Sequence, residues 1–315
     1  MQANSTPLQV SVVVTTRNRL DFLKQCVDSV LCQRGVTWEL IIVDDASTDP
    51  TRTWLASIAG MTLRTHYFNA RGERCRARNQ GLSMAQGRYI MFLDDDDWLW
   101  PNALESLAAA LNEHPGAVAA TGARWDVFAD ENYARRDAHP RRLLERNIQD
   151  ELLFGWSAVS GQNLYRTSII RAIGGYTDDS LVPCEDRDLW LKVAARGSVV
   201  IVPQRVMSYR YHGAQVRPPG IAHLRNRVMG KAIQALPKER RRRAFALRRS
   251  GRMIEQAETE MSQGNPLTAC WIACSAVYNS PGIFASPLIG EWVFRRLAGR
   301  FYRRFFPPSA AAGSG

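Results

Sequence analysis

The 315-residue sequence lacks several features that would assign it to a common class. It has no Gly-rich phosphate loop of the Walker type and no G-x-G-x-x-G after its first predicted strand, which disfavours a P-loop nucleotide or a dinucleotide. Its six cysteines are scattered, without zinc-type pairs or a disulfide pattern, so reduced thiols are expected. Residues 1–9 lack a secretory signal. We therefore expect a cytoplasmic protein.

A long apolar run is missing as well. Residues 264–290 carry no charge, but proline and asparagine interrupt them and leave an apolar helical piece over 267–280. That piece is shorter than the roughly 20 residues that a membrane span needs. A packed pair of helices is therefore expected here.

Most of the chain carries no net charge. Residues 1–224 contain 25 Lys/Arg and 25 Asp/Glu, whereas residues 225–315 contain 16 and 5, which accounts for the net charge of +11. Basic clusters are typical of proteins that bind nucleic acid or anionic lipid. Features that stack on bases or enter a groove are lacking, so nucleic acid is not an expected partner.

Strands and helices alternate along the first part of the sequence. Buried strands are predicted over residues 10–15, 38–43, 61–68, 89–93 and 117–121, with helical patterns between most of them. This alternation predicts an α/β fold, with a mostly parallel sheet covered by helices on both faces.

Polar clusters follow three of these strands, at Thr16–Arg19, Asp44-Asp45 and Asp94–Asp97. Ligands of such sheets bind outside the carboxyl ends of the strands, so the three clusters should share one rim. Four adjacent acids repel one another, and Mg²⁺ or Mn²⁺ would remove the repulsion. A solvated acidic turn is the alternative. A carboxylate after the second strand can bind a base or ribose, so the rim suits a nucleoside diphosphate attached to a transferable group.

The order and spacing of these motifs over residues 10–100 resemble the family 2 glycosyltransferases of the GT-A fold. The motifs are Thr-Thr-Arg-Asn-Arg at 15–19, Ile-Val-Asp-Asp-Ala-Ser-Thr-Asp at 42–49, and Ala-Arg-Asn-Gln-Gly-Leu at 77–82. The resemblance implies a Rossmann-like nucleotide-diphospho-sugar transferase domain over roughly 8–220, followed by a basic helical tail over 221–315. It also implies a nucleotide-sugar donor, with UDP the expected nucleotide, and Mn²⁺ or Mg²⁺ as cofactor.

The resemblance also implies roles for individual residues. Asp94 and Asp96 would bind the metal, and His212 could complete that site. Asp186 would take a proton from the acceptor hydroxyl, with Glu185 beside it. Acids in the first turn of a helix beginning near Glu185 could instead complement the helix dipole, and His212 could be structural. The residues implied in donor binding are Thr16, Arg17, Asn18, Asp44, Asp45, Arg78, Asp94 and Asp95.

The expected activity is therefore metal-assisted, inverting transfer of a sugar to a hydroxyl of a glycan or lipid-linked acceptor. Two alternatives remain at this point. A metal-dependent nucleotidyltransferase would use a similar acidic rim, but it would consume a nucleoside triphosphate and has no need of Glu185-Asp186. A non-catalytic glycan- or lipid-binding protein on a decayed transferase scaffold would lack donor hydrolysis.

Two segments could contact the acceptor or a membrane. Residues 124–154 are polar and Arg-rich, typical of either a solvated insertion or an acceptor-binding loop. Residues 291–306 predict a helix with an apolar face and an Arg-rich opposite face, which is typical of a helix at a membrane interface. A helix that packs on the protein, or a subunit contact, is the alternative. The protein is thus expected in the cytoplasm or on the inner face of the cell membrane. The apolar face comprises Val293, Phe294, Leu297, Phe301 and Phe305.

Overall fold

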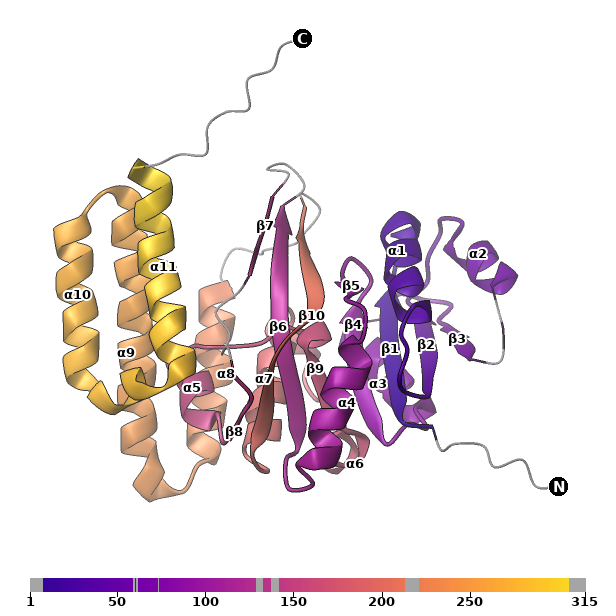
Figure 1. The fold of residues 1–315 in the computed structure, drawn as a ribbon, viewed down its shortest axis with the longest axis horizontal. Helices are drawn as coiled ribbons and strands as arrows, with labels where there is room; N and C mark the ends of the chain where they lie inside the picture. Colours follow the sequence, from indigo (N-terminus) through magenta and orange to yellow (C-terminus); the bar gives the residue numbers. More distant parts are fainter. Residues whose placement is uncertain are drawn as a thin grey trace, which may run out of the picture. The chain divides into compact units, whose positions relative to one another are not determined.

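The computed structural model describes residues 8–58, 60, 62–72, 74–128, 133–136, 142–212 and 221–305 (Figure 1). The chain divides into two compact units. The first, an α/β unit, takes Met1–Ile148 and Ala158–Gly230. The second, a helical unit, takes Gln149–Ser157 and Lys231–Gly315. Each unit is described by itself below.

The α/β unit begins with strands and helices in strict alternation, as the sequence predicts. The neighbouring strands β3, β2, β1 and β4 are parallel, and Val10 of β1 lies opposite Trp38 on one side and Tyr89 on the other. The elements are β1 (Val10–Thr16), α1 (Leu20–Leu31), β2 (Trp38–Asp44), α2 (Thr51–Ser57), β3 (Leu63–Tyr67), α3 (Arg74–Met84) and β4 (Tyr89–Asp94).

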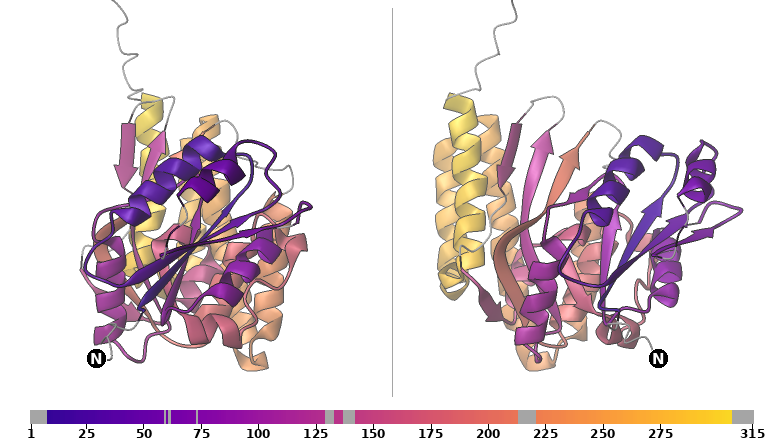
Figure 2. Two further views of the ribbon diagram at one scale, coloured as in Figure 1. Left: turned by 90° about the vertical axis from the view of Figure 1, so that its right-hand side faces the viewer. Right: turned by 45° about the vertical axis from the view of Figure 1, so that its right-hand side comes forward.

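The sheet continues beyond β4 in the order β9-β6-β10-β5, and its strands are twisted relative to one another (Figure 2). Strand β9 is antiparallel to both neighbours, whereas β6 and β10 are parallel. The expected α/β fold is thus confirmed, with antiparallel strands added to its parallel part. The further elements are β5 (Trp98–Leu99), α4 (Ala103–Glu113), β6 (Ala119–Phe128), β9 (Asn163–Arg166), α6 (Thr167–Ala172), α7 (Glu185–Ala194) and β10 (Val199–Tyr211).

The polar segment over 124–154 is more regular than its sequence indicates. Strand β6 runs on to Phe128, where the sequence predicts an end at residue 121. It stays extended because β10 pairs with one edge and β7 (Tyr133–Arg136) with the other. β8 (Leu144–Arg146) pairs with β10, and α5 (Gln149–Phe154) belongs to the helical unit. Paired neighbours satisfy backbone hydrogen bonds regardless of side-chain polarity.

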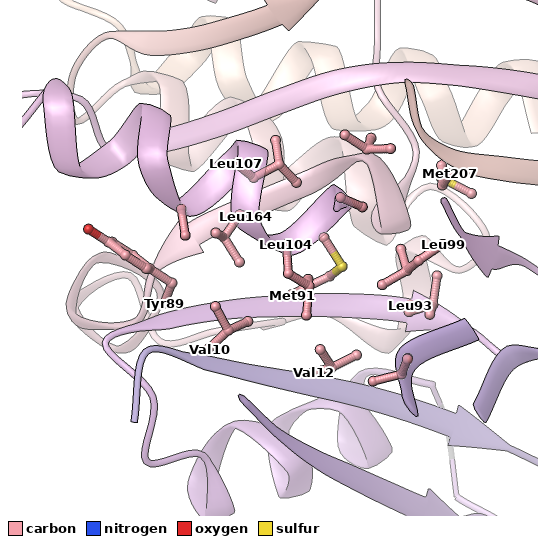
Figure 3. Close-up of a cluster of buried hydrophobic side chains, with 14 of the residues drawn as sticks. Val10, Val12, Tyr89, Met91, Leu93, Leu99, Leu104, Leu107, Leu164 and Met207 are labelled. Carbon is pink, nitrogen blue, oxygen red and sulfur yellow. The ribbon is translucent and has the colours of Figure 1, made fainter. Parts of the chain in front are cut away.

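The core of the α/β unit lies on the face of the sheet covered by α1 and α4. Alternate residues of β1 and β4 point into it, among them Val10, Val12 and Met91, and meet Leu104 and Leu107 of α4 (Figure 3). Residue Val13 is also buried, but it faces α3 on the opposite side of the sheet. Helices therefore cover both faces, and the central strands are apolar on both sides as expected for a buried parallel sheet.

The helical unit contains α5, α9 (Lys238–Gln263), α10 (Pro266–Asn279) and α11 (Pro287–Phe305), and α8 (Ile221–Ala235) spans the boundary between the units. Gly264 ends α9 in the left-handed conformation, and α10 then packs back on α9. Ala257 and Met261 of α9 form a small core with Ala269 and Ile272 of α10. No helix in the described part of the chain is long and apolar enough to cross a membrane.

Gly81 sets how closely α3 approaches the sheet, which gives a test of the fold. A Cβ atom at Gly81 would lie 2.2 Å from Cγ1 of Val13. We expect Gly81→Ala to reduce the free energy of unfolding, because overpacking costs about 1–3 kcal/mol and outweighs the roughly 1 kcal/mol that alanine gains over glycine in a helix. Denaturant unfolding measures the change.

Gly230→Ala is the matched control, because a Cβ atom at this helical glycine meets nothing within 4 Å. The control should be as stable as the unaltered protein or slightly more stable. Equal stability of the two variants would contradict the close packing of α3 on β1.

Candidate active site

A cavity of about 610 Å³ opens at the carboxyl ends of the parallel strands of the α/β unit. It brings together residues that are far apart in the sequence, from the ends of β1, β2 and β4 and from the start of α7. The predicted site residues among its lining are Thr16, Arg17, Asp45, Asp94, Asp95, Asp96, Glu185 and Asp186.

Arg78 joins two segments that line this cavity, the end of β4 and the start of α7. Its side chain is only 2% exposed, and Nη2 donates a 2.7 Å hydrogen bond to Oδ1 of Asp94 at the end of β4. Nη1 donates to Oε1 of Glu185 at 2.7 Å and lies 3.1 Å from Oδ1 of Asp186, both in the first turn of α7. Burial alone would lower the pKa of this guanidinium, but the three carboxylates raise it well above its ordinary value. Arg78 is therefore charged and holds α7 against β4.

Asp186 is held through one of its two oxygens. The hydroxyl of Tyr176 donates to Oδ1 at 3.1 Å, and Arg78 approaches the same atom. The Tyr176 ring also lies 5.0 Å from the guanidinium carbon of Arg78. The Asp186 side chain is 28% exposed and that of Glu185 only 3%. Burial and the nearby charge of Asp186 raise the pKa of Glu185. Asp186 is thus the more accessible acid of the pair.

The acids after β4 form a compact cluster. Carboxylate oxygens of Asp94, Asp96 and Asp97 lie within 4.8 Å of one another. Oδ2 of Asp96 accepts from Nη1 of Arg19 at 2.8 Å and lies 3.0 Å from Nε2 of His212. The sequence-based metal ligands Asp94 and Asp96 are therefore together, and His212 lies beside one of them.

The electrostatics of this cluster fit a divalent cation. Burial raises the pKa of Asp95 to about 7, and burial together with Asp96 raises that of Asp97 well above its ordinary value. Burial would also raise the pKa of Asp94, but Arg78 outweighs it and the pKa is lowered. Oδ2 of Asp97 is buried and has no hydrogen-bond partner within the described residues. Hard cations prefer such oxygen ligands, so the residues present suit Mn²⁺ or Mg²⁺.

Asp95 bonds to residues at and just after the end of β1. Its Oδ2 accepts from the hydroxyl of Thr16 at 2.8 Å, and its Oδ1 accepts from Arg19 at 3.2 Å. Asp95 therefore holds the β1 end beside the acid cluster.

Asp45 and three arginines supply the remaining polar lining. Oδ1 of Asp45 accepts from the backbone N–H of Gly72 at 2.6 Å, which holds the loop before α3 near the end of β2. Arg17, Arg71 and Arg74 also line the cavity. This part of the site offers cationic and hydrogen-bonding groups to an anionic ligand.

Three predicted donor-binding residues, Asn18, Asp44 and Arg78, lie outside the cavity lining. The Asp44 side chain is fully buried, and its Oδ2 accepts from Nε of Arg52 at 2.8 Å. Oδ1 of Asn18 accepts from the backbone N–H of Thr48 at 2.7 Å. Asn18 thus joins the loops after β1 and β2, whereas Asp44 bonds to the start of α2.

Sequence reasoning assigned no individual role to several residues of the site. Arg19, Arg71 and Arg74 could have been found, because arginines next to a predicted acidic rim are an available signal. Asp97 could have been found as well, because it is the last of four consecutive acids. Tyr176 gave no signal, since only the folded turn before α7 brings its hydroxyl to Asp186.

Comparison with known proteins places this site in a family. Residues 11–174 match the family model described as glycosyl transferase family 2. The chain belongs to that family. It is therefore a glycosyltransferase.

Two proteins described as glycosyltransferases and a solved structure resemble it. An uncharacterized glycosyltransferase of Rickettsia typhi is 26% identical over 217 residues, which are 68% of each chain. TuaG of Bacillus subtilis, described as a teichuronic acid biosynthesis glycosyltransferase, is 40% identical over 121 residues, which are 38% of this chain and 48% of TuaG. Residues 1–349 of Staphylococcus aureus TarS share the fold, with a TM-score of 0.66 at 16% identity over 96% of this chain and 93% of that one.

The raised pKa of Asp95 gives a prediction for stability. In the unfolded chain this carboxyl ionises near its ordinary pKa of 3.8, whereas in the folded protein it does so at about 7. The folded state therefore holds the proton longer, and the protein loses stability as pH rises from about 4 to about 7. Asp95→Asn removes this loss.

We expect the stability of Asp95→Asn relative to the unaltered protein to rise by a few kcal/mol between about pH 4.5 and about pH 7.5, since one pKa unit corresponds to about 1.4 kcal/mol. Urea unfolding in chelator at both pH values measures it. Asp28→Asn, at an exposed acid of α1, should follow the unaltered protein at both. A pH-independent difference for Asp95→Asn would contradict the buried, protonatable carboxyl.

Proposed function

We propose that this glycosyltransferase transfers a sugar from a UDP-sugar to a hydroxyl of a glycan or lipid-linked acceptor, with inversion at the anomeric carbon. The observation that carries the proposal is that one cavity holds both an acid cluster suited to a metal-bound diphosphate and a partly exposed carboxylate, Asp186. Family membership favours glycosyl transfer over the nucleotidyltransferase and the non-catalytic protein.

The donor would lie between the ends of β1 and β2 and the start of α3. Asp45 and Thr16 offer hydrogen bonds to the base and ribose, and Arg17, Arg71 and Arg74 offer positive charge to the diphosphate. A UDP nucleotide is supported by a structural relative, since S. aureus TarS 1–349 has been solved in complex with UDP-GlcNAc, with a TM-score of 0.66 to this chain.

Asp94 and Asp96 would hold the metal, with Asp97 and His212 next to them. A divalent cation, Mn²⁺ or Mg²⁺, would there neutralise the charge that develops on the diphosphate leaving group. Arg78 keeps Asp94 ionised by lowering its pKa, and so maintains a ligand in its charged form.

Asp186 would act as the general base. As the acceptor oxygen bonds to the anomeric carbon, the bond from that carbon to the diphosphate oxygen breaks, and the hydroxyl proton passes to the carboxylate. Tyr176 and Arg78 both approach Oδ1, so we assign the proton to Oδ2. Glu185, bonded to Arg78 and only 3% exposed, would support its neighbour without contacting the acceptor.

A glycan acceptor is supported by the biosynthetic roles named for two relatives. TuaG is named for teichuronic acid biosynthesis. ExoO, a Rhizobium meliloti protein of succinoglycan biosynthesis, is 30% identical over 153 residues, which are 46% of this chain and 43% of ExoO. Both names refer to polysaccharides, and we propose an acceptor of that chemical class or its lipid-linked precursor.

The test of the proposal is calorimetric titration with UDP, GDP, ADP and their sugar conjugates, in Mn²⁺, in Mg²⁺ and in chelator. Metal-dependent binding of UDP and one UDP-sugar is the expected result. Tighter binding of another nucleotide would overturn the donor assignment, and metal-independent binding would overturn the cation site.

Asp96→Ala tests the metal site. We expect it to raise the dissociation constant of UDP in Mn²⁺ by about tenfold or more, which is about 1.4 kcal/mol or more, and to leave binding in chelator unchanged. Calorimetry measures both constants. Glu113→Ala, at an exposed acid of α4, should bind as the unaltered protein does. Unchanged metal-dependent binding in Asp96→Ala would remove this residue from the site.

Asp186→Asn tests the general base. We expect the rate of donor turnover to fall by about 10²–10⁴-fold, the usual contribution of such a group, while the affinity for UDP changes little. Release of UDP, with and without a panel of glycan acceptors, measures turnover. A variant with full turnover would contradict the assignment, and so would one that has lost UDP binding.

Tyr176→Phe tests whether Tyr176 positions the general base, Asp186, since the variant keeps the base but loses the hydrogen bond to it. Loss of one hydrogen bond to a charged group costs about 1.5 kcal/mol or more, so we expect kcat to fall about tenfold with the KM for the donor unchanged. Tyr89→Phe is the matched control, because the Tyr89 hydroxyl donates to Asn112 at 2.7 Å, at the other end of β4. An equal loss of kcat in both variants would mean that Tyr176 acts only through stability.

A further inference from the structure

Helix α10 presents an apolar face to solvent. Leu267 is 86% exposed, Trp271 71% and Tyr278 88%, whereas the other exposed large apolar side chains of the described residues lie between 39% and 69%. At about 100° per residue, these three and the exposed Cys274 lie within roughly 60° of the helix circumference. We call this strip, formed by Leu267, Trp271, Cys274 and Tyr278, the outer face of α10.

The opposite face of α10 makes the contacts within the helical unit. Ala269, Ile272 and Ala276 are at most 5% exposed. Ala269 and Ile272 pack on Ala257 and Met261 of α9. The outer face is thus not needed to close this core.

The last helix does not offer a comparable surface in its described part. Leu297, which the sequence places on the membrane-facing side of residues 291–306, packs against the core formed by α9 and α10. Phe294 of the same predicted face is 69% exposed. The predicted apolar face of α11 is therefore divided, because one part of it packs on neighbouring helices. The side chains of Phe301 and Phe305 lie outside the described residues.

Charge around the outer face favours an anionic partner. Residues 231–315 contain 14 Lys/Arg and 5 Asp/Glu, yet α10 contains no charged residue. Arg249 and Arg252 of the adjoining helix α9 are exposed, and the neighbouring Ser250 and Met253 contact Ser280 and Asn279 at the end of α10. The acids on this part of α9 are half-buried and have partners of their own, since Glu255 pairs with Arg248, Glu258 with Arg296, and Glu260 accepts from Asn265. An uncharged helix with Trp and Tyr on its outer side, next to exposed arginines, has the composition of a helix lying in the interface of an anionic bilayer.

The size of the outer face disfavours a second protein copy as its occupant. The 14 residues of α10 span about 21 Å, and a strip about 10 Å wide amounts to roughly 200 Å². A stable protein interface buries about 800 Å² on each partner. A bilayer surface needs less area, since an interfacial helix inserts only about 5–10 Å and electrostatic attraction to anionic lipid adds to its binding.

We propose that the outer face of α10 inserts into the surface of an anionic lipid bilayer and attaches this enzyme to the membrane peripherally. The proposal goes beyond the glycosyl transfer reaction and does not depend on the identity of donor or acceptor. Its consequence for function is that transfer would take place at a membrane surface, where a lipid-linked acceptor is available.

A fluorophore on Cys274 tests the insertion directly. Cys26, Cys75 and Cys184 are buried, so Cys32→Ser together with Cys270→Ser leaves Cys274 as the single exposed thiol. This variant of the full chain is labelled with an environment-sensitive nitrobenzoxadiazole group and mixed with vesicles of phosphatidylcholine containing about a third phosphatidylglycerol. We expect the emission to rise several-fold and shift to shorter wavelength. The control carries Cys270→Ser and Cys274→Ser, is labelled at the exposed Cys32 just after α1, and should show no change.

Vesicle co-sedimentation gives a second, label-free readout. We expect Trp271→Ser to reduce the partition constant about tenfold or more, because the variant loses the burial of a large apolar side chain in the bilayer surface. Leu143→Ser, at another exposed apolar residue (45% exposed), should partition as the unaltered protein does. Raising the salt concentration should weaken the binding.

Three results would overturn the proposal. The first is an unchanged emission from Cys274 with anionic vesicles. The second is equal binding to pure phosphatidylcholine, which would exclude a role for anionic lipid. The third is a Cys274 emission change that depends on protein concentration and appears without vesicles, since that would assign the outer face to a second copy of the chain.

Discussion

The buried guanidinium of Arg78 is the interaction on which the site depends. It bonds to Asp94 and Glu185 and lies 3.1 Å from Asp186, so it joins the end of β4 to the start of α7. Carboxylates this close would repel one another in a poorly solvated site, and a buried charge is stable only when it is paired and hydrogen-bonded. Arg78 satisfies both requirements, and Gly81, one turn along α3, provides the close approach to β1 that carries Arg78 to this position.

The acids after β4 differ in pKa, and Arg78 is one cause of the difference. It lowers the pKa of Asp94, whereas burial raises the pKa values of Asp95 and Asp97. Thr16 and Arg19 bind Asp95 and turn it toward β1. The run of four acids therefore contains residues in different chemical environments. Within the cluster of Asp94, Asp96 and Asp97, Arg78 pairs with Asp94 and Arg19 with Asp96, whereas Oδ2 of Asp97 has no hydrogen-bond partner among the described residues. A divalent cation would relieve the repulsion among these carboxylates.

The helical unit has its own core and a different distribution of charge. Its helices form their own small core from α9, α10 and Leu297 of α11. The charged residues of α9 and the uncharged outer face of α10 are separated along the chain, and no acid on α10 balances the exposed arginines. The residues proposed for catalysis thus belong to the α/β unit, and those proposed for membrane attachment belong to the helical unit.

The sequence by itself determined the order of strands and helices in the first half of the chain, because apolar periodicity and turn residues are local signals. It also determined which motifs follow which strands, and hence the family. Tertiary structure decided which neighbouring residue reaches the cavity. Asp45 lines it while Asp44 is buried against Arg52, because Asp44 is the last residue of β2, whereas Asp45 lies in the loop after it and bonds to Gly72. It also brought Tyr176 to Asp186 and exposed one face of α10. These outcomes depend on contacts between segments distant in sequence, which no local pattern encodes.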